Sequence, residues 1–215
     1  MSQPNKLSAM DTLIIQFDQA LRTLVPGSSQ PRRITPAEKK TEQTLSDVER
    51  KHAASLMRIN HTGEVCAQAL YQGQAATAKL AGVRSAMENA ASEEVDHLAW
   101  CEQRLVELDS RTSFLNPIWY AMSFGVGAAA GLAGDKWSLG FVAETEQQVC
   151  EHLEDHLEQL PESDARSKAI LEQMIIDERA HGETAKQAGG AELPLPVKKL
   201  MAGMSELMKK AVYRI

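Results

Sequence analysis

Two helical segments of the sequence carry the same pair of residues with metal-binding chemistry. Glu94 and His97 lie three positions apart in AMENAASEEVDHLAWCEQRL, and Glu178 and His181 lie three positions apart in IIDERAHGE. On an α-helix this spacing places both side chains on one face, one turn apart, where they could reach a common ion. Each pair continues an apolar stripe that should face a core, and a buried carboxylate or imidazole needs a partner.

Two further long helical segments each offer an inward glutamate at a matching height. Glu64 and Glu146 continue the apolar stripes of these segments. In an antiparallel helix pair, residues at equal height lie symmetrically about the turn. The glutamates of the first pair are centred near Gly82 and those of the second pair beside Pro161, and both residues are turn signals. The second set follows the first at a nearly constant offset, which indicates an internal duplication of a metal half-site.

Such a set of ligands has a specific chemistry. Four carboxylates confined together would repel one another, and two divalent cations would cancel their charge. Oxygen-rich ligation with some imidazole and no thiolate favours iron or manganese over structural zinc. The pattern is typical of ferritin-like di-iron carboxylate proteins. The predicted metal ligands are Glu64, Glu94, His97, Glu146, Glu178 and His181.

Several other polar residues lie near these positions. Glu144 competes with Glu146, but an offset of two residues turns it off the apolar face. Tyr71 and His152 are candidates for hydrogen-bonding the ligands, and His61 fits either such a role or a plain surface position. The acidic residues that fall off the stripes are expected to be solvated: Glu93, Asp96, Glu151 and Asp177.

The composition predicts an all-α protein. Aromatic residues make up 5% of the 215 residues, and alternation typical of strands is rare. We predict a ferritin-like four-helix bundle with a long crossover between helices two and three, plus short N- and C-terminal helices. Residues 1–45 form an N-terminal helix and a Pro- and Ser-rich linker, and residues 46–215 form the di-iron domain. The four bundle helices are expected at about 46–79, 85–108, 138–160 and 164–187.

Charge and cysteine usage narrow the class of partner and the compartment. The formal net charge of -6 argues against a nucleic-acid-binding surface. The odd number of cysteines (Cys66, Cys101 and Cys150), with no C-x-x-C pair, predicts a reducing compartment. The N-terminal residues have no basic stretch followed by a long apolar stretch, so we expect no secretion.

Two segments are candidates for membrane contact. Residues 112–134 contain no charged residue or histidine, and their length would fit a membrane span. Pro117, Asn116 and four glycines favour a buried or interfacial crossover instead. The C-terminal PVKKLMAGMSELMKKAVYRI predicts a basic amphipathic helix, which either lies on an anionic membrane or packs on its own bundle.

Three motifs resemble one particular family. INHTGEVCAQALYQGQA at 59–75, EEVDHLAWCEQRL at 93–105 and DERAHGETA at 177–185 resemble the demethoxyubiquinone hydroxylases of ubiquinone biosynthesis. The resemblance covers about residues 46–215. The third bundle helix departs from it, because relatives often have adjacent glutamates and then His-His-Tyr, where this chain has Glu146-Gln147 and Glu151-His152-Leu153.

The resemblance implies a function and partners. The six predicted ligands would hold two iron ions, with Glu94 and Glu178 as bridges. The reaction implied is a monooxygenation, in which one oxygen atom of dioxygen enters the ring of a polyprenyl benzoquinol. Because such a quinol resides in the bilayer, we expect the protein at a membrane surface, peripheral on the cytoplasmic face of the bacterial inner membrane. Homo-oligomers and contacts with other ubiquinone-biosynthesis proteins remain open.

Two alternatives compete with a hydroxylase. The first is a ferritin-like iron-storage or peroxide-reducing protein, against which the missing C-x-x-C pairs and the uncharged crossover count. The second is a metal-free membrane scaffold that presents quinone to other enzymes. It leaves four glutamates on apolar stripes unexplained.

Overall fold

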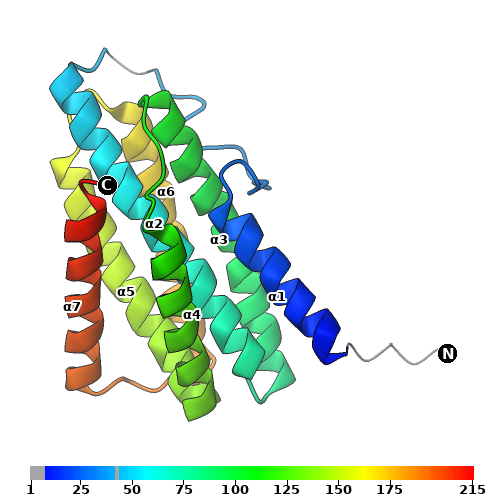
Figure 1. The fold of residues 1–215 in the computed structure, drawn as a ribbon. Coiled ribbons are helices and arrows are strands. Elements are labelled where there is room, and N and C mark those ends of the chain that lie inside the picture. Colours follow the sequence, from blue (N-terminus) through cyan, green and yellow to red (C-terminus); the bar gives the residue numbers. More distant parts are fainter. Residues whose placement is uncertain (1–7, 42–43) are drawn as a thin grey trace.

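A computed structural model of the chain describes residues 8–41 and 44–215, and throughout these residues the regular structure is helical (Figure 1). The predictions that fall on residues 1–7 and 42–43 lie outside the described residues. The fold prediction of a four-helix bundle with a crossover and two further short helices is confirmed. The helices are α1 (Ala9–Leu24), α2 (Asp47–Thr77), α3 (Ala81–Glu107), α4 (Asn116–Ala133), α5 (Asp135–Gln159), α6 (Ala165–Gln187) and α7 (Leu195–Val212).

Side-chain caps fix where two of the bundle helices begin. Ser46 accepts a hydrogen bond from the Glu49 backbone N–H at 3.3 Å, and the Glu49 carboxylate accepts one from the Ser46 N–H at 2.8 Å, which completes the predicted capping box of α2. At the start of α6, Asp164 Oδ1 accepts a hydrogen bond from the Ser167 N–H at 2.8 Å. These caps fix the positions at which α2 and α6 enter the bundle.

Helices α2, α3, α5 and α6 form the bundle, and its core consists of two apolar clusters. One cluster includes Met57, Trp100 and Met174, and the other includes Met87 and Val142. Along every bundle helix, the predicted metal ligands lie between the positions that contribute to these two clusters. The ligands therefore form a polar layer between two dry ones, where water cannot solvate them.

The crossover forms a helix that lies along the outside of α2. Two glycines allow the close approach: a Cβ on Gly127 would lie 2.2 Å from the Leu70 carbonyl oxygen, and one on Gly73 would lie 2.3 Å from that of Phe124. Neither contact could exist with a larger residue. Among the described residues, no helix is both long and apolar enough to cross a bilayer.

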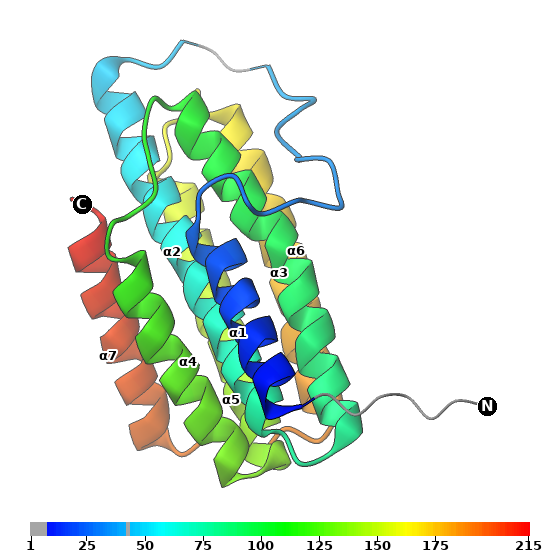
Figure 2. The same ribbon diagram turned by 45° about the vertical axis from the view of Figure 1, so that its right-hand side comes forward.

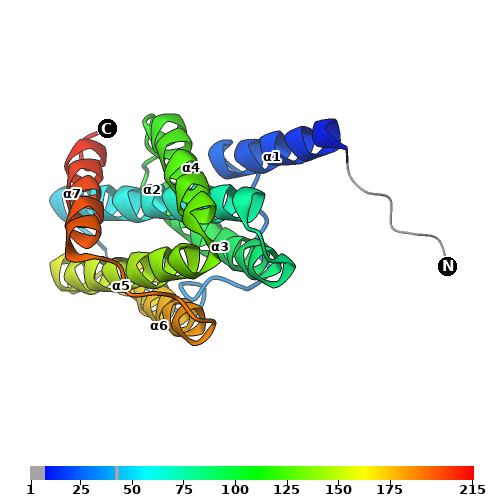
Figure 3. The same cartoon turned by 90° about the horizontal axis from the view of Figure 1, so that it is seen from below.

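Helices α1, α4 and α7 lie on one side of the bundle, away from α6 (Figures 2 and 3). In α7, Met208 and Val212 pack against Ile59 of α2 and Trp119 of α4. Leu200 and Leu207 of the same helix are 67% and 56% exposed. The C-terminal helix therefore packs along one edge, as one of the two alternatives predicted, and its other edge is exposed. Contact of this exposed edge with a membrane stays a prediction.

The chain between α1 and α2 runs across α3, and we call residues 26–41 the strap. The Gly27 N–H donates to Glu102 Oε1 at 2.6 Å, and the Arg32 N–H donates to Asp96 Oδ1 at 2.6 Å. Trp100 Nε1 donates to the Arg33 carbonyl oxygen at 3.2 Å. The Pro- and Ser-rich composition predicts a linker, but the structure shows a segment held to α3 by its own backbone.

Candidate metal centre

The structure directs the six predicted ligands into the polar layer of the bundle. Glu64 comes from α2, Glu146 from α5, and one Glu-x-x-His pair comes from each of α3 and α6. The side chains of Glu64, Glu94, His97 and Glu178 are at most 4% exposed, whereas that of His181 is 13% exposed. Each helix supplies its ligands because its apolar stripe faces the core and the ligands lie within that stripe.

His97 lies against three of the glutamates. Its Nδ1 atom is 3.0 Å from Glu94 Oε2, 2.9 Å from Glu178 Oε1 and 3.7 Å from Glu64 Oε2. One atom from each of these four residues can be chosen so that all lie within 4.8 Å of one another. This spacing suits ligands that surround a single ion.

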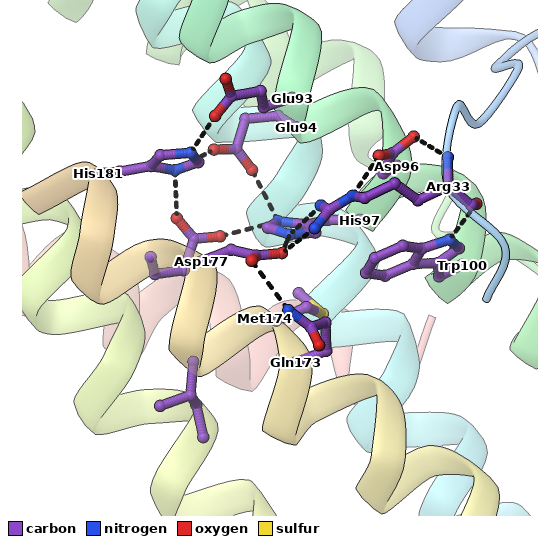
Figure 4. A network of polar contacts seen from close by, with 12 residues as sticks. Arg33, Glu93, Glu94, Asp96, His97, Trp100, Gln173, Met174, Asp177 and His181 are labelled. Atoms are coloured by element: carbon purple, nitrogen blue, oxygen red, sulfur yellow. Dashed lines mark hydrogen bonds and ion pairs between the residues drawn. The ribbon is translucent and has the colours of Figure 1, made fainter. Parts of the chain in front are cut away.

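His181 occupies the equivalent position in the other half of the site. Its Nδ1 atom is 3.0 Å from Glu94 Oε1 and 3.2 Å from Glu178 Oε2. Each of these two glutamates therefore offers one oxygen to each imidazole and lies between them (Figure 4 shows Glu94 and both rings). This is the position that bridging carboxylates of a two-metal centre would occupy.

Glu146 is buried beside this group and accepts a hydrogen bond from the Tyr71 hydroxyl. Burial, together with the charges of Glu178 and Glu94, raises its pKa well above the ordinary value. Burial also raises the pKa of Tyr71 well above its ordinary value, so the hydroxyl remains a donor at neutral pH. Among the described residues, Glu146 is the predicted glutamate ligand that forms no ion pair with either imidazole. The Tyr71 hydroxyl holds it instead.

The electrostatics of the cluster show how much these groups need counter-charge. Burial raises the pKa of Glu64 well above its ordinary value. Burial also opposes the ionisation of Glu94, but the two histidines outweigh it and leave its pKa lowered. For His97, burial disfavours the charged form, yet the surrounding carboxylates raise the pKa well above the ordinary value. Protons on the imidazoles therefore supply part of the positive charge that the glutamates require.

An unpaired carboxylate oxygen in the cluster shows that these residues suit a divalent metal. Glu64 Oε2 is buried and has no hydrogen-bond partner within the described part of the chain. An unsatisfied carboxylate oxygen in a dry interior is costly, and a cation at this point would coordinate it. A buried group of glutamates and a histidine that can hold a metal ion is therefore present.

Two acidic residues outside the predicted set contact the imidazoles. Glu93 is exposed, as expected, whereas the expectation that Asp177 is solvated is wrong, because its side chain is only 16% exposed. His97 Nε2 lies 2.9 Å from Asp177 Oδ2, and His181 Nε2 lies 2.7 Å from Glu93 Oε2 (Figure 4). Each acid directly precedes a predicted ligand glutamate and reaches the histidine of the opposite helix. With Nε2 donating to a carboxylate, Nδ1 is free to bind a metal. The signal in the sequence was the repeated acid before each Glu-x-x-His.

Within the described residues, the strap adds a contact on the His97 side and none on the His181 side. Arg33 pairs with Asp96 through Nε at 2.7 Å and with Asp177 through Nη1 at 2.8 Å, and its guanidinium lies 4.8 Å from the centre of the Trp100 ring. Asp96, expected to be solvated, is 3% exposed. Composition could not reveal this contact, because the arginine lies more than sixty residues from both acids in sequence.

The remaining polar candidates lie outside the ligand cluster. His152 Nε2 and His156 Nδ1 both contact Asn60 Oδ1, at 3.1 and 2.8 Å. His61 is buried and lies 3.4 Å from the Asn116 side-chain nitrogen. These polar residues of α2 therefore join it to α5 and α4, and a supporting role of His152 toward the metal remains a prediction.

Two off-stripe glutamates of α5 lie away from the polar layer. Glu144 pairs with Lys198 at 3.0 Å, at the start of α7. Glu151 is exposed, as expected, and accepts a hydrogen bond from Gln147 at 3.3 Å. An offset of two residues on one helix thus separates Glu144, which is buried in an ion pair with α7, from the predicted ligand position at Glu146.

Comparison with known proteins places the chain in a family. The family described as ubiquinone biosynthesis protein COQ7 matches residues 51–212. The chain is 60% identical over 215 residues to a 3-demethoxyubiquinol 3-hydroxylase of Azotobacter vinelandii, and 61% identical over 215 residues to one of Stutzerimonas stutzeri. In both comparisons all of this chain and all of the relative are covered. The motifs of α2, α3 and α6 had predicted this relationship, and the chain belongs to the COQ7 family of ubiquinone biosynthesis proteins.

Proposed function

We propose that the chain hydroxylates the ring of a polyprenyl demethoxyubiquinol with dioxygen, at a centre of two iron ions. The carrying observation is the buried glutamate and histidine cluster at the middle of the bundle, in a chain whose relatives of 60% identity are named 3-demethoxyubiquinol 3-hydroxylase. The cluster is rich in oxygen donors and contains no thiolate, a set that suits iron.

The proposed ligands divide into two groups. Glu64 and His97 would hold one metal, Glu146 and His181 the other, and Glu94 with Glu178 would bridge them. The contacts of both bridging glutamates with both imidazoles support this division. When bound, the two iron ions supply the redox chemistry that activates dioxygen. The helices supply fixed ligand positions and exclude water from them.

Access to the centre is proposed between α2 and α5. A narrow cavity of about 10 Å³, room for about one water molecule, is lined by Leu70, Phe141 and Val142 and reaches Tyr71 and Glu146. Leu70 lies against Gly127 of α4, so the outer end of the cavity is beside the crossover helix. The apolar residues of its lining favour a quinol ring over a polar solute.

The outer surface supports attachment to a membrane. On α4, Ile118 and Val126 are 58% and 46% exposed, and on α1 Phe17 is 66% exposed. Together with the exposed leucines of α7, these are exposed apolar residues on three helices. The three helices lie on one side of the bundle (Figure 3). We propose that this side rests on the bilayer that holds the substrate, on the cytoplasmic face of the bacterial inner membrane.

The proposal predicts both metal content and product. Chain loaded anaerobically with ferrous iron should bind two iron ions and convert a demethoxyubiquinol, given dioxygen and a reductant, to a product heavier by one oxygen atom. Two bound irons without product would favour iron storage or peroxide reduction. A chain that binds no iron would favour a quinone-presenting scaffold.

A further inference from the structure

The two halves of the candidate metal centre are supported unequally. On one side, Asp177 contacts His97 Nε2 at 2.9 Å and is itself held by Arg33 at 2.8 Å and by Gln173 at 2.9 Å. On the other side, Glu93 contacts His181 Nε2 at 2.7 Å. Within the described residues Glu93 forms no ion pair with a lysine or arginine, and its side chain is 58% exposed.

Arg33 is well suited to fix the geometry of its side. Its planar guanidinium pairs with Asp96 and Asp177 at the same time, and Nη2 lies 3.5 Å from His97 Nε2 (Figure 4). Asp96 has a side chain only 5% exposed and is also held by the Arg32 N–H, so it is a rigid anchor. A fork of donors that bridges two carboxylates restrains both more than a point charge could.

The position of Arg33 on the strap is also fixed independently of its side chain. The backbone around it is bound to α3 through Asp96 and Trp100. The strap lies outside residues 51–212, the segment that the family matches. Arg33, which lies outside the matched segment, thus contacts Asp177, the partner of the candidate metal ligand His97.

We infer that Arg33 is a positioning residue of the metal centre: it holds Asp177 against His97 and makes the metal position at His97 the tighter of the two. The inference rests on the proposed two-metal centre. The orienting partner of a metal-bound histidine typically contributes about 10- to 100-fold to metal affinity. Loss of the arginine should leave Asp177 with Gln173 and the imidazole alone, and it should not disturb the His181 side.

The test compares metal binding by full-length variants under anaerobic conditions. Metal-free wild-type protein, Arg33→Gln and Arg33→Lys would be titrated with ferrous iron against a competing chelator. Arg32→Gln is the matched control, because it removes the same charge from the neighbouring exposed side chain. Mössbauer spectra of the ⁵⁷Fe-loaded proteins would report the two iron environments separately.

The expected result is selective. Arg33→Gln should weaken the binding of one of the two irons by about tenfold or more and should change one of the two Mössbauer signals. Arg32→Gln should match wild type in both measurements. Arg33→Lys should fall between them, since an ammonium can pair well with only one carboxylate. Should Arg33→Gln fail to fold, Asp177→Asn, which leaves the strap and its bonds to Asp96 in place, is expected to give the same selective loss.

Two outcomes would overturn the inference. Unchanged affinity and spectra in Arg33→Gln would show that the arginine does not position the site. Equal weakening of both irons, together with a lower melting temperature of the metal-free protein, would show a structural role only. Failure of the wild-type protein to bind two metals would instead remove the proposed centre itself.

Discussion

At the scale of single residues, the feature that demands explanation is the burial of four glutamates in one layer. Three of them, Glu64, Glu94 and Glu178, lie around His97 with at most 4% of their side chains exposed. Protonated imidazoles compensate part of this charge, and two metal ions would compensate it more completely. The predictions at this scale follow from the exchange of the imidazole protons for metal ions.

Metal removal should make stability depend on pH. In the metal-free protein burial disfavours the charged form of His181, but Glu178 and Glu94 outweigh it and raise its pKa from 6.5 to about 12. A histidine with a raised folded pKa stabilises the fold fully below about pH 6.5, and this contribution is lost as pH rises toward the folded pKa. The metal-loaded site has no such protons to lose.

We therefore expect the gap in melting temperature between iron-loaded and metal-free protein to widen from about pH 6 to about pH 8.5. Thermal unfolding followed by circular dichroism under anaerobic conditions measures it. A gap that stays constant or narrows across this range would contradict the electrostatic account of the site.

Substitution of a proposed bridging glutamate should be far more damaging than substitution of a glutamate outside the polar layer. Glu178→Gln removes an oxygen donor that faces both imidazoles, so we expect loss of at least one iron per chain. Hydroxylation should fall by more than the roughly 10- to 100-fold typical of an outer partner. Glu144→Gln removes a carboxylate paired with Lys198 and should retain both irons. Iron analysis and product formation check both variants, and equal iron content would refute the ligand assignment.

At the scale of helices, the close packing of α4 on α2 decides where the crossover lies. Gly127→Ala would place a methyl group 2.2 Å from the Leu70 carbonyl oxygen, which is backbone and cannot move aside alone. We expect a loss of about 1–3 kcal/mol in the free energy of unfolding. Gly125→Ala is the matched control, since its Cβ would meet open space and a helical alanine gains about 0.5–1 kcal/mol over glycine.

Chemical denaturation of both variants measures these changes. Equal stability of the two variants would show that α4 does not depend on its contact with α2. A further readout is hydroxylation, because the proposed cavity ends beside Gly127 and displacement of α4 should impair access for the substrate.

The sequence predicted the parts of this architecture that depend on helical periodicity and local spacing. Helical periodicity predicted the four bundle helices, and the capping box at Ser46 and Glu49 predicted the start of α2. Mirror spacing about the turns selected Glu64 and Glu146 as the inward glutamates. These features depend on local spacing, which a single sequence contains.

What the sequence did not reveal depends on contacts between distant segments. Asp177 and Glu93 lie off the apolar stripes of their own helices, yet each faces a histidine of another helix. Arg33 belongs to a strap whose composition is typical of a linker, and only the folded chain brings it to Asp96 and Asp177. Periodicity within one helix carries no information about such partners.

At the scale of the whole molecule, the exposed apolar residues of α1, α4 and α7 support the proposed contact with the membrane that holds the substrate. Removal of α7 would be a poor test of membrane contact, since Met208 and Val212 pack against the bundle and their loss would expose Ile59 and Trp119. Substitution of residues on the outer edge leaves that packing intact.

We expect the double variant Leu200→Gln and Leu207→Gln to weaken binding to anionic liposomes by about tenfold or more, because each leucine contributes roughly 1.5–3 kcal/mol when fully buried. Ile176→Gln is the matched control, since this residue is 60% exposed on α6, away from the three helices. Cosedimentation with liposomes measures both. Equal binding of the double variant and wild type would exclude α7 from the membrane contact.

The most direct test of the central claim is the origin of the oxygen that enters the substrate. Protein loaded anaerobically with two irons per chain would be given a demethoxyubiquinol, a reductant and ¹⁸O₂, and the quinone product would be weighed by mass spectrometry. The account predicts one ¹⁸O atom per product molecule, none from metal-free protein and little from Glu178→Gln. A product that takes its oxygen from water, or one formed equally by metal-free protein, would contradict it.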